Sequence, residues 1–360
     1  MNDLQGQRIV VAGAGAVGSV TALTLLRCGA DVLLADPAKR GDNASGVAAG
    51  MLAPAFEALL DPVAHDQFPL LAVARDFWPD LEASLGVGVI DRAGALYVPE
   101  DEDDLQSRAR RLAVLDPSSE VLSEAKSAVL CPGLACDGPV LFSALDWRLE
   151  PDAALAALQG AFAAEGGRMA DVAVTGWSKG EARLSSGEIY PADVLVLATG
   201  SAAGPAPAIA QLGQLTPIKG QILRFEAQSP LVGPSVRATG IYVAPSAHGA
   251  VVGATMQAGQ TDLRIEPQAV SRLHAAAGRL FPALLGAKPT ARAGVRAATA
   301  DGLPLVGSSP EHDGVMLAVG ARRNGWLLAP AMADVVAARL RGLDAGAFGA
   351  AFDPARFAVR

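Results

Sequence analysis

The chain of 360 residues contains few cysteines, and this shortage excludes two classes of protein. Its three cysteines, Cys28, Cys131 and Cys136, are an odd number, which does not describe a disulfide framework in a chain of this length. No cluster of cysteine and histidine in the sequence completes a metal site around them. We therefore expect free thiols in a reducing cytoplasm and no bound metal.

Basic residues are also scarce relative to acidic ones. Lysine and arginine number 29 against 37 acidic residues, which gives a formal net charge of −8. Because nucleic-acid phosphates require a basic face, this balance argues against a nucleic-acid partner. Charged residues make up 18% of the chain and hydrophobic residues 51%, a composition that excludes disorder as the main state. The length fits one large domain or two interlocked ones.

Hydrophobic runs that could cross a membrane are absent on closer inspection, although the mean hydropathy is +0.31. Residues 9–26 form an uncharged run of 18 residues, which is near membrane-span length and lies where a signal peptide would lie. This run contains three glycines, and a buried strand followed by a buried helix has the same composition. Glycines and prolines break the second uncharged stretch, at 194–218. We expect no stable membrane insertion.

The N-terminal segment carries a dinucleotide-binding pattern. A β-rich run at 8–12 precedes the letters GAGAVG, and a helical pattern follows them. The next predicted strand, 31–35, ends at Asp36, which lies 18 residues after the last glycine of the motif. The order is a strand, the GxGxxG turn, a helix, a second strand and an acidic residue. This order is typical of a Rossmann nucleotide site.

Each residue of this motif has a physical role. Gly13 permits the tight turn, Gly15 lets the backbone approach a pyrophosphate, and Gly18 lets helix and strand pack closely. The helix N-terminus adds unpaired N–H groups and the positive end of its dipole. Asp36 can accept hydrogen bonds from a ribose. The small-residue segment 43–54 would let a long ligand lie along its backbone, or it is an ordinary loop.

Further elements of an α/β domain follow. The pattern predicts a helix at 151–165, a strand at 171–174, a turn at 178–181, a return strand at 183–185, a buried central strand at 192–198 and a last helix from Asn324 to Gly342. Pro330 would be tolerated only in the first turn of that last helix.

Other stretches predict a second, mainly antiparallel sheet inserted into the first domain. Strands are expected at 221–225, 241–244 and 250–253, and the acidic run 100–104 is either a solvated face or a helix start. The predicted division assigns 1–86, 138–213 and 290–360 to the nucleotide domain and 87–137 and 214–289 to the second domain.

Six motifs in order along nearly the whole chain carry a resemblance to a known family. They are GAGAVGS at 13–19, ASGVAAGMLAP at 44–54, PIKGQILRF at 217–225, YVAPSAHGAVVGATMQ at 242–257, GVRAATADGLPLVG at 294–307 and RNGWLLAPA at 323–331. Together they resemble the D-amino-acid-oxidase-type flavoproteins, and among these the glycine oxidases of thiamin biosynthesis. The resemblance implies a Rossmann-type, GR2-like FAD-binding domain with an inserted substrate domain.

The resemblance also implies non-covalent FAD, because no cysteine lies near Asp301, where related sarcosine oxidases attach their flavin. The positions carried over as cofactor contacts are Gly13, Gly15, Ala16, Val17, Gly18, Asp36, Ser45, Gly46, Gly50, Met51, Val174, Gly200, Arg322, Asn324, Gly325, Trp326 and Leu327. The last helix would direct its N-terminus at the flavin and stabilise negative charge on the reduced ring.

For the substrate, the resemblance implies three catalytic-site residues: Arg296, Arg323 and Tyr242. A guanidinium matches an amino-acid carboxylate in two parallel hydrogen bonds. From sequence alone, the two arginines could instead form structural ion pairs, and the tyrosine could be a packing residue. Arg322 and Ala297 depart from the family pattern, which leaves the identity of the amine open.

The implied reaction converts glycine, water and O2 into glyoxylate, ammonia and H2O2, with hydride transfer to flavin N5. None of the four histidines lies in a motif expected to line the site, which favours an amine over a 2-hydroxy acid as substrate. Two alternatives stay open: a D-amino-acid or sarcosine-type enzyme with another electron acceptor, and a non-catalytic flavin-binding subunit. A homo-oligomer is a further open alternative.

Overall fold

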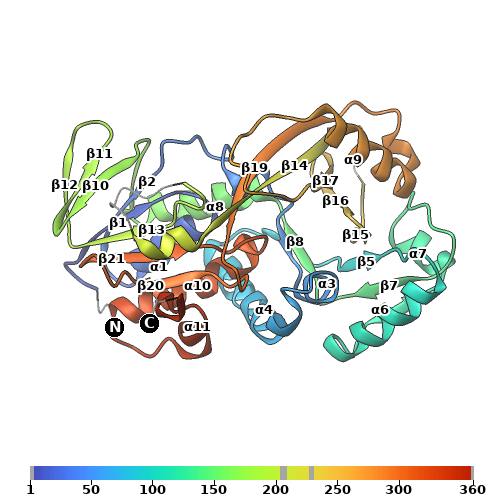
Figure 1. Cartoon of the computed structure of the whole chain (residues 1–360), viewed down its shortest axis with the longest axis horizontal. Helices are drawn as coiled ribbons and strands as arrows, with labels where there is room; N and C mark the ends of the chain where they lie inside the picture. Colours follow the sequence, from blue (N-terminus) through green and yellow to red (C-terminus); the bar gives the residue numbers. More distant parts are fainter. Residues whose placement is uncertain (1–3, 203–208, 227–230, 358–360) are drawn as a thin grey trace.

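The computed structural model of the chain describes residues 4–202, 209–226 and 231–357. The molecule has two halves, each built around one large sheet, with a smaller sheet between them. Long strands run from one half toward the other (Figure 1). The first half holds the nucleotide motif, and the second holds most of the predicted substrate strands.

The first sheet has six strands in the order β20-β21-β13-β1-β2-β9. Their bounds are β1 (Arg8–Ala12), β2 (Asp31–Ala35), β9 (Arg168–Ala170), β13 (Val194–Leu197), β20 (Leu305–Ser308) and β21 (Val315–Val319). All neighbours are parallel except β20 and β21. The strand order reverses between β1 and β13, and in such sheets ligands bind at the carboxyl ends of the strands beside this point.

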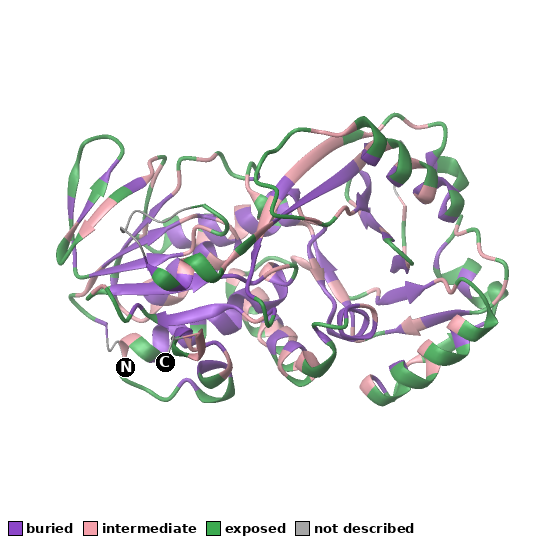
Figure 2. Cartoon of the chain, viewed as in Figure 1, coloured by how far each residue is buried: buried purple, intermediate pink, exposed green. Residues whose placement is uncertain are grey.

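Both faces of this sheet are covered, which explains its continuous apolar strands. Alternate residues of β1 belong to different cores: Ile9 and Val11 pack with helices α1 (Ala16–Arg27), α8 (Pro151–Ala164) and α10 (Gly325–Leu340). Val10 and Ala12 pack instead toward the antiparallel strands β10 (Val174–Ser178), β11 (Gly180–Leu184) and β12 (Ile189–Ala192). Figure 2 shows the resulting buried layer.

The second sheet has nine strands in the order β18-β14-β17-β16-β15-β5-β7-β6, with β19 also paired to β14. Their bounds are β5 (Ala95–Tyr97), β6 (Glu120–Leu122), β7 (Val140–Ser143), β14 (Thr216–Glu226), β15 (Ser235–Ala238), β16 (Ile241–Ser246), β17 (Gly249–Gly253), β18 (Gln257–Ala258) and β19 (Thr290–Ala298). Only β5 and β15 are parallel neighbours. Helix α9 (Pro267–Leu280) packs on this sheet, and α6 (Glu102–Leu115) and α7 (Glu124–Leu130) lie at its other end (Figure 1).

The remaining elements are short. They are α2 (Ala44–Val47), β3 (Met51–Leu52), α3 (Pro54–Leu60), α4 (Phe68–Asp76), α5 (Trp78–Leu85), β4 (Ile90–Asp91), β8 (Trp147–Leu149) and α11 (Gly346–Ala351), with 3-10 turns at His65–Gln67, Ala210–Gln214, Pro282–Leu284 and Pro354–Phe357. Strands β3, β8 and β4 form a small sheet of their own.

The predicted α/β class with an antiparallel second sheet is confirmed, and some bounds differ. The hairpin expected at 171–185 starts later, at Val174, and turns tightly at Lys179. The acidic run is a helix start, because the Asp101 side chain caps α6 by accepting a hydrogen bond from Asp104 N–H. The domain division stays a prediction. Its limits fall just before β7 and β19, which hydrogen-bond into the second sheet, so a division by sheets would place both strands there.

The expectation that Pro330 lies in a first helical turn is wrong. It is the sixth residue of α10, where a proline cannot donate to the carbonyl four residues earlier. That carbonyl belongs to Trp326, and the indole Nε1–H of the fully buried Trp78 donates to it at 3.0 Å. A tertiary hydrogen bond thus replaces the missing helical one and makes the proline tolerable.

In the described part of the chain, no helix combines the length and apolar character needed to cross a membrane.

Replacing Trp78 with Phe should lower the free energy of unfolding by about 2–4 kcal/mol, because it leaves a buried carbonyl unpaired and a small cavity. Chemical denaturation measures this loss. Trp177→Phe is the matched control, since its indole donates to an exposed carbonyl of Asp313. Pro330→Ala should recover part of this stability loss in the Trp78→Phe background, because the alanine N–H at position 330 can donate to the carbonyl of Trp326. A double-mutant cycle would show this recovery as a coupling between the two substitutions. Absence of coupling would refute the hydrogen-bond explanation.

Candidate functional site

The glycine-rich turn lies at the carboxyl end of β1, where α1 begins. Gly13 has φ +104°, and a Cβ there would lie 2.4 Å from Ala198 O. A Cβ on Gly18 would lie 1.7 Å from Gly13 O, so helix and turn can pack only without side chains. Both glycines therefore have the structural roles predicted from the motif.

Two polar side chains hold the backbone of this turn. The Asp36 carboxylate accepts hydrogen bonds from Ala14 N–H at 2.7 Å and from Ala38 N–H at 2.8 Å. The Ser45 hydroxyl accepts from Ala16 N–H, in the first turn of α1, at 2.9 Å. The predicted segment around Ser45 is thus brought to the helix N-terminus although it is nearly 30 residues away in sequence.

The start of α10 reaches the same place. The Trp326 indole donates to Ser45 O at 3.1 Å, and its side chain is only 4% exposed. Leu327 is 1% exposed in the same core. Contacts from these two residues to a ligand would therefore come from their backbone.

A partly buried arginine and a partly buried tyrosine lie together on the second sheet. Arg296 is on β19, and Tyr242 is on β16. Burial lowers the pKa of Arg296, and the Tyr242 hydroxyl opposes this shift. Burial raises the pKa of Tyr242, and the positive charges of Arg296 and Arg323 oppose that shift. The two groups are thus close enough to affect each other.

Two glycines make room for these side chains. A Cβ on Gly220 of β14 would lie 2.1 Å from Arg296 Nη1. A Cβ on Gly253 of β17 would lie 2.2 Å from the Tyr242 hydroxyl oxygen. The motifs KGQ and GAT therefore contain glycine because the guanidinium and the phenol occupy the space beside the backbone.

Arg323 differs from Arg296 because two carboxylates already bind it. Its Nη2 lies 3.2 Å from Glu57 Oε2, and its Nη1 lies 3.3 Å from Asp61 Oδ2. Among the described residues, Arg296 forms no ion pair, and its one polar contact is to Met256 Sδ at 3.8 Å. Of the two predicted arginines, Arg323 is therefore paired with carboxylates in the described structure and Arg296 is not.

Sequence reasoning missed both acids, Glu57 on α3 and Asp61 just after it, and it missed two further arginines. Arg237 is 4% exposed and contacts Glu57 Oε2 at 3.5 Å and Met51 Sδ at 3.0 Å. Arg224 donates to Gly46 O at 2.7 Å. Arg224 is part of the motif PIKGQILRF, which could have indicated it, whereas no local signal marks Arg237.

Comparisons with known proteins agree with this geometry. The sequence profile of the DAO family, described as FAD dependent oxidoreductase, matches residues 8–339. The chain belongs to the DAO family.

Several relatives of this DAO-family chain are named as glycine oxidases. A glycine oxidase of Pseudomonas aeruginosa is 29% identical over 93% of this chain and 95% of its own length. A Rhizobium etli protein, provisionally assigned as the thiamine biosynthesis oxidoreductase ThiO, is 35% identical over 92% of this chain and 96% of its length. The crystal structure of glycine oxidase from Geobacillus kaustophilus superposes with a TM-score of 0.85 at 26% identity and covers 98% of this chain and 100% of its own. The chain is therefore an FAD-dependent amine oxidoreductase.

The described residues fit an FAD. A cavity of about 80 Å³ lies beside the turn and is lined by Ala14, Asp36, Asn43 and Gln159, among others. A Cβ on Gly15 would lie 2.9 Å from Ser45 Oγ, so Ser45 packs directly against the backbone at the start of α1. Three buried polar atoms farther along the site, Glu57 Oε1, Arg224 Nε and Arg237 Nε, have no partner within the described structure. Backbone for phosphates and unpaired polar atoms for a ring suit a dinucleotide.

The other predicted cofactor residues are distributed around this path, where they stay predictions. Gly50 has φ +70°, and a Cβ there would lie 2.0 Å from Leu149 O. Val174 starts β10, Gly200 follows β13 with φ +64°, and Asn324 and Gly325 start α10. Val17 lies in the first turn of α1.

Arg322, a departure from the family pattern, is the one non-glycine residue with positive φ in the described chain, at +51°. Such a conformation is uncommon for a bulky residue and requires support from its surroundings. An ion pair with Asp61 and a hydrogen bond from Arg322 N–H to Ala297 O at 2.8 Å supply this support. Both departures, Arg322 and Ala297, are thus in contact.

Replacing Gly220 with Ala should displace the Arg296 guanidinium and raise the KM for an amino-acid substrate by about tenfold to a hundredfold, because a charge-assisted bidentate contact is lost. Flavin content should stay unchanged, because the substitution alters no residue of the glycine-rich turn. Gly160→Ala on α8 is the control, because no atom lies within 4 Å of its Cβ position. Steady-state kinetics would contradict the explanation if both variants behaved alike.

Asp146 makes stability depend on pH. This buried carboxylate accepts hydrogen bonds from Ala55 and Phe56 N–H, and burial raises its pKa to about 6. Because its pKa is raised, the folded state holds more protons than the unfolded state between about pH 4 and 6, and stability falls as pH rises through this window. We expect a loss of up to about 3 kcal/mol.

The Asp146→Asn variant should lack this pH dependence in urea denaturation series from pH 4 to 7. Asp103→Asn on the exposed face of α6 is the control, and it should follow the unmodified protein. A pH-independent difference between Asp146→Asn and the unmodified protein would contradict the assignment.

Proposed function

We propose that the chain catalyses oxidative deamination of a small amino acid, with glycine as the first candidate. The observation that carries this proposal is the Arg296 guanidinium, which is partly buried and lacks a carboxylate partner among the described residues. A partly buried cation without a partner is costly, and a substrate carboxylate would compensate it. The glycine oxidases among the relatives support glycine as the substrate.

The site residues would orient the substrate by its carboxylate. Arg296 would bind both oxygens, and the Tyr242 hydroxyl would donate to one of them. Arg323 adds positive potential while Glu57 and Asp61 hold it in place. This arrangement fixes one end of the substrate, so that its Cα–H bond can be presented in a single orientation.

When bound, FAD supplies the two-electron acceptor that takes hydride from the substrate Cα. The chain itself needs no side-chain base if the amine is already neutral. His65 and His274 ring nitrogens contact the backbone carbonyls of Ala58 and Leu284, which fits a role in structure. Water then hydrolyses the imine to glyoxylate and ammonia, and O2 accepts the electrons to form H2O2.

We propose that the chain binds FAD non-covalently and functions in the cytoplasm. The three cysteines are free thiols: Cys28 ends α1, Cys131 ends α7, and Cys136 follows it. Cys28 lies at the opposite end of α1 from the predicted cofactor residues Ala16, Val17 and Gly18, and α7 carries none of the predicted cofactor residues. The relative assigned as ThiO supports a place in thiamin biosynthesis.

Anaerobic flavin bleaching tests the proposal. Glycine should bleach the flavin, with sarcosine, D-alanine, D-proline and 2-hydroxy acids as the comparison panel. Bleaching by D-alanine but not by glycine would contradict glycine as the substrate. If none of the amines bleached the flavin, the enzymatic role would be refuted. Admission of air then distinguishes O2 from another electron acceptor, because slow reoxidation of the flavin would favour a dehydrogenase over an oxidase.

Arg296→Lys should weaken substrate binding at least tenfold and leave the flavin spectrum intact, since lysine cannot form the bidentate contact. Arg292→Lys is a matched control on the same strand, because Arg292 already pairs with Asp42 at 2.9 Å. Loss of flavin from Arg296→Lys would show that the arginine is structural.

A further inference from the structure

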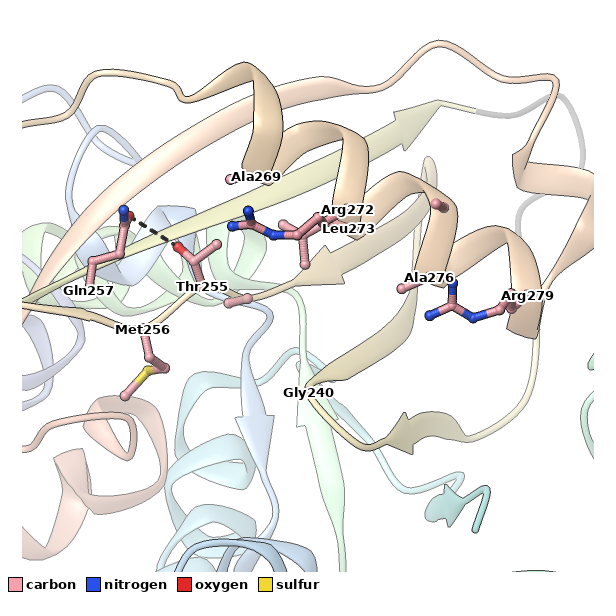
Figure 3. A pocket seen from close by; sticks show the side chains of 11 residues that line it. Gly240, Thr255, Met256, Gln257, Ala269, Arg272, Leu273, Ala276 and Arg279 are labelled. Atoms are coloured by element: carbon pink, nitrogen blue, oxygen red, sulfur yellow. Dashed lines mark hydrogen bonds between the residues drawn. The ribbon is translucent and has the colours of Figure 1, made fainter. Parts of the chain in front are cut away.

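A methionine sulfur contacts the arginine to which the substrate carboxylate is assigned. Met256 follows β17, and its Sδ lies 3.8 Å from Arg296 Nη1. Figure 3 shows the Met256 side chain pointing away from α9, to the side opposite Thr255 and Gln257. Because a thioether sulfur is only a weak acceptor, this contact leaves most of the hydrogen-bonding capacity of the guanidinium unused.

Met256 is also accessible to small solutes. It is 44% exposed, and Met169 is 43% exposed. The other methionines that the structure describes are more enclosed, since Met51 is partly buried and both Met316 and Met332 are buried. Because an oxidant must reach the sulfur to form a sulfoxide, Met256 and Met169 are the first candidates for methionine oxidation in the described chain.

The surroundings of Met256 differ from those of the other two methionines. Met169 lies on β9, and its sulfur has no hydrogen-bond contact within the described part of the chain. Met51 Sδ lies 3.0 Å from Arg237 Nη2, but this arginine already has a carboxylate partner in Glu57. Of these three sulfurs, only that of Met256 is both well exposed and in contact with a guanidinium that no carboxylate neutralises.

Oxidation would change what Met256 offers to Arg296. It converts an apolar thioether into a polar sulfoxide, whose oxygen can accept hydrogen bonds. The 3.8 Å between Sδ and Nη1 leaves space for an oxygen bonded to sulfur at an N–H···O distance of about 2.9 Å. A hydrogen bond from a charged donor is stronger than a neutral one. Because this oxygen is part of the chain, it would compete effectively with a dissolved carboxylate.

We propose that Met256 is an oxidative modification site, at which H2O2 forms a sulfoxide that occupies Arg296 and blocks binding of the substrate carboxylate. The inference rests on the proposed function, which supplies H2O2 as a product. The sulfur lone pair attacks one oxygen of H2O2, the O–O bond breaks, and the other oxygen leaves as water: R–S–CH3 and H2O2 become R–S(O)–CH3 and H2O. Sulfur loses two electrons and the peroxide gains them. The enzyme thereby loses affinity for its substrate as its own product accumulates.

Treatment of the holoenzyme with H2O2, stopped with catalase, tests the site, and mass spectrometry of peptides reports the sulfoxide at each methionine. The KM for glycine should rise about tenfold, the effect of one charge-assisted contact, while kcat stays within twofold. In Met256→Leu, a substitution of similar volume, the KM should be the same before and after treatment. Met169→Leu is the matched control, because Met169 is equally exposed, and it should respond like the unmodified protein.

Binding of acetate separates this inference from the proposed function. Acetate has a carboxylate and no amine, and flavin difference spectra report its Kd. Peroxide should raise this Kd about tenfold, and the two methionine sulfoxide reductases, one for each epimer, should restore it, even if no amine reduces the flavin. An unchanged Kd in protein whose Met256 is fully oxidised would overturn the proposal. So would a Met256 that stays reduced while Met169 is oxidised, or an equal rise in Met256→Leu.

Discussion

A guanidinium without a carboxylate partner is the constraint on which the site depends. Burial lowers the pKa of Arg296, and the Tyr242 hydroxyl and Glu57 oppose this shift. Gly220 and Gly253 leave space for the two side chains, and in the proposed function a substrate carboxylate would compensate the cost of the unpaired cation. The neighbouring acids are kept away from Arg296 by pairing with other arginines.

This pairing joins the two halves of the molecule. Glu57 of α3 and Asp61 just after it bind Arg323, which precedes α10, while Arg237 of the second sheet also reaches Glu57. A set of buried charges is stable only if each has a partner with good geometry. One ionic network thus connects the start of α10 in the first half with β15 in the second.

Local features of the chain could be predicted well because short-range physics determines them. The turn at Gly13 requires positive φ and the contact at Gly18 excludes a Cβ, and both follow from spacing alone. The position of Pro330 could not be inferred in this way, because the indole of Trp78 satisfies the carbonyl that the proline leaves free. That donor is 248 residues away from Trp326 in sequence.

The same distinction holds for the site. Residue types and motif spacing were sufficient for the dinucleotide-binding pattern and the fold class, and the resemblance carried by six motifs indicated the FAD-dependent family and the candidates Arg296, Arg323 and Tyr242. They could not show which arginine is already neutralised, since that depends on Asp61 and Glu57 reaching Arg323 through space. Nor could they show that Met256 contacts Arg296, because β19 and the segment after β17 come together only through their pairing with β14. Charge pairing and contacts between distant side chains are properties of the tertiary structure, whereas turns and caps are properties of neighbouring residues.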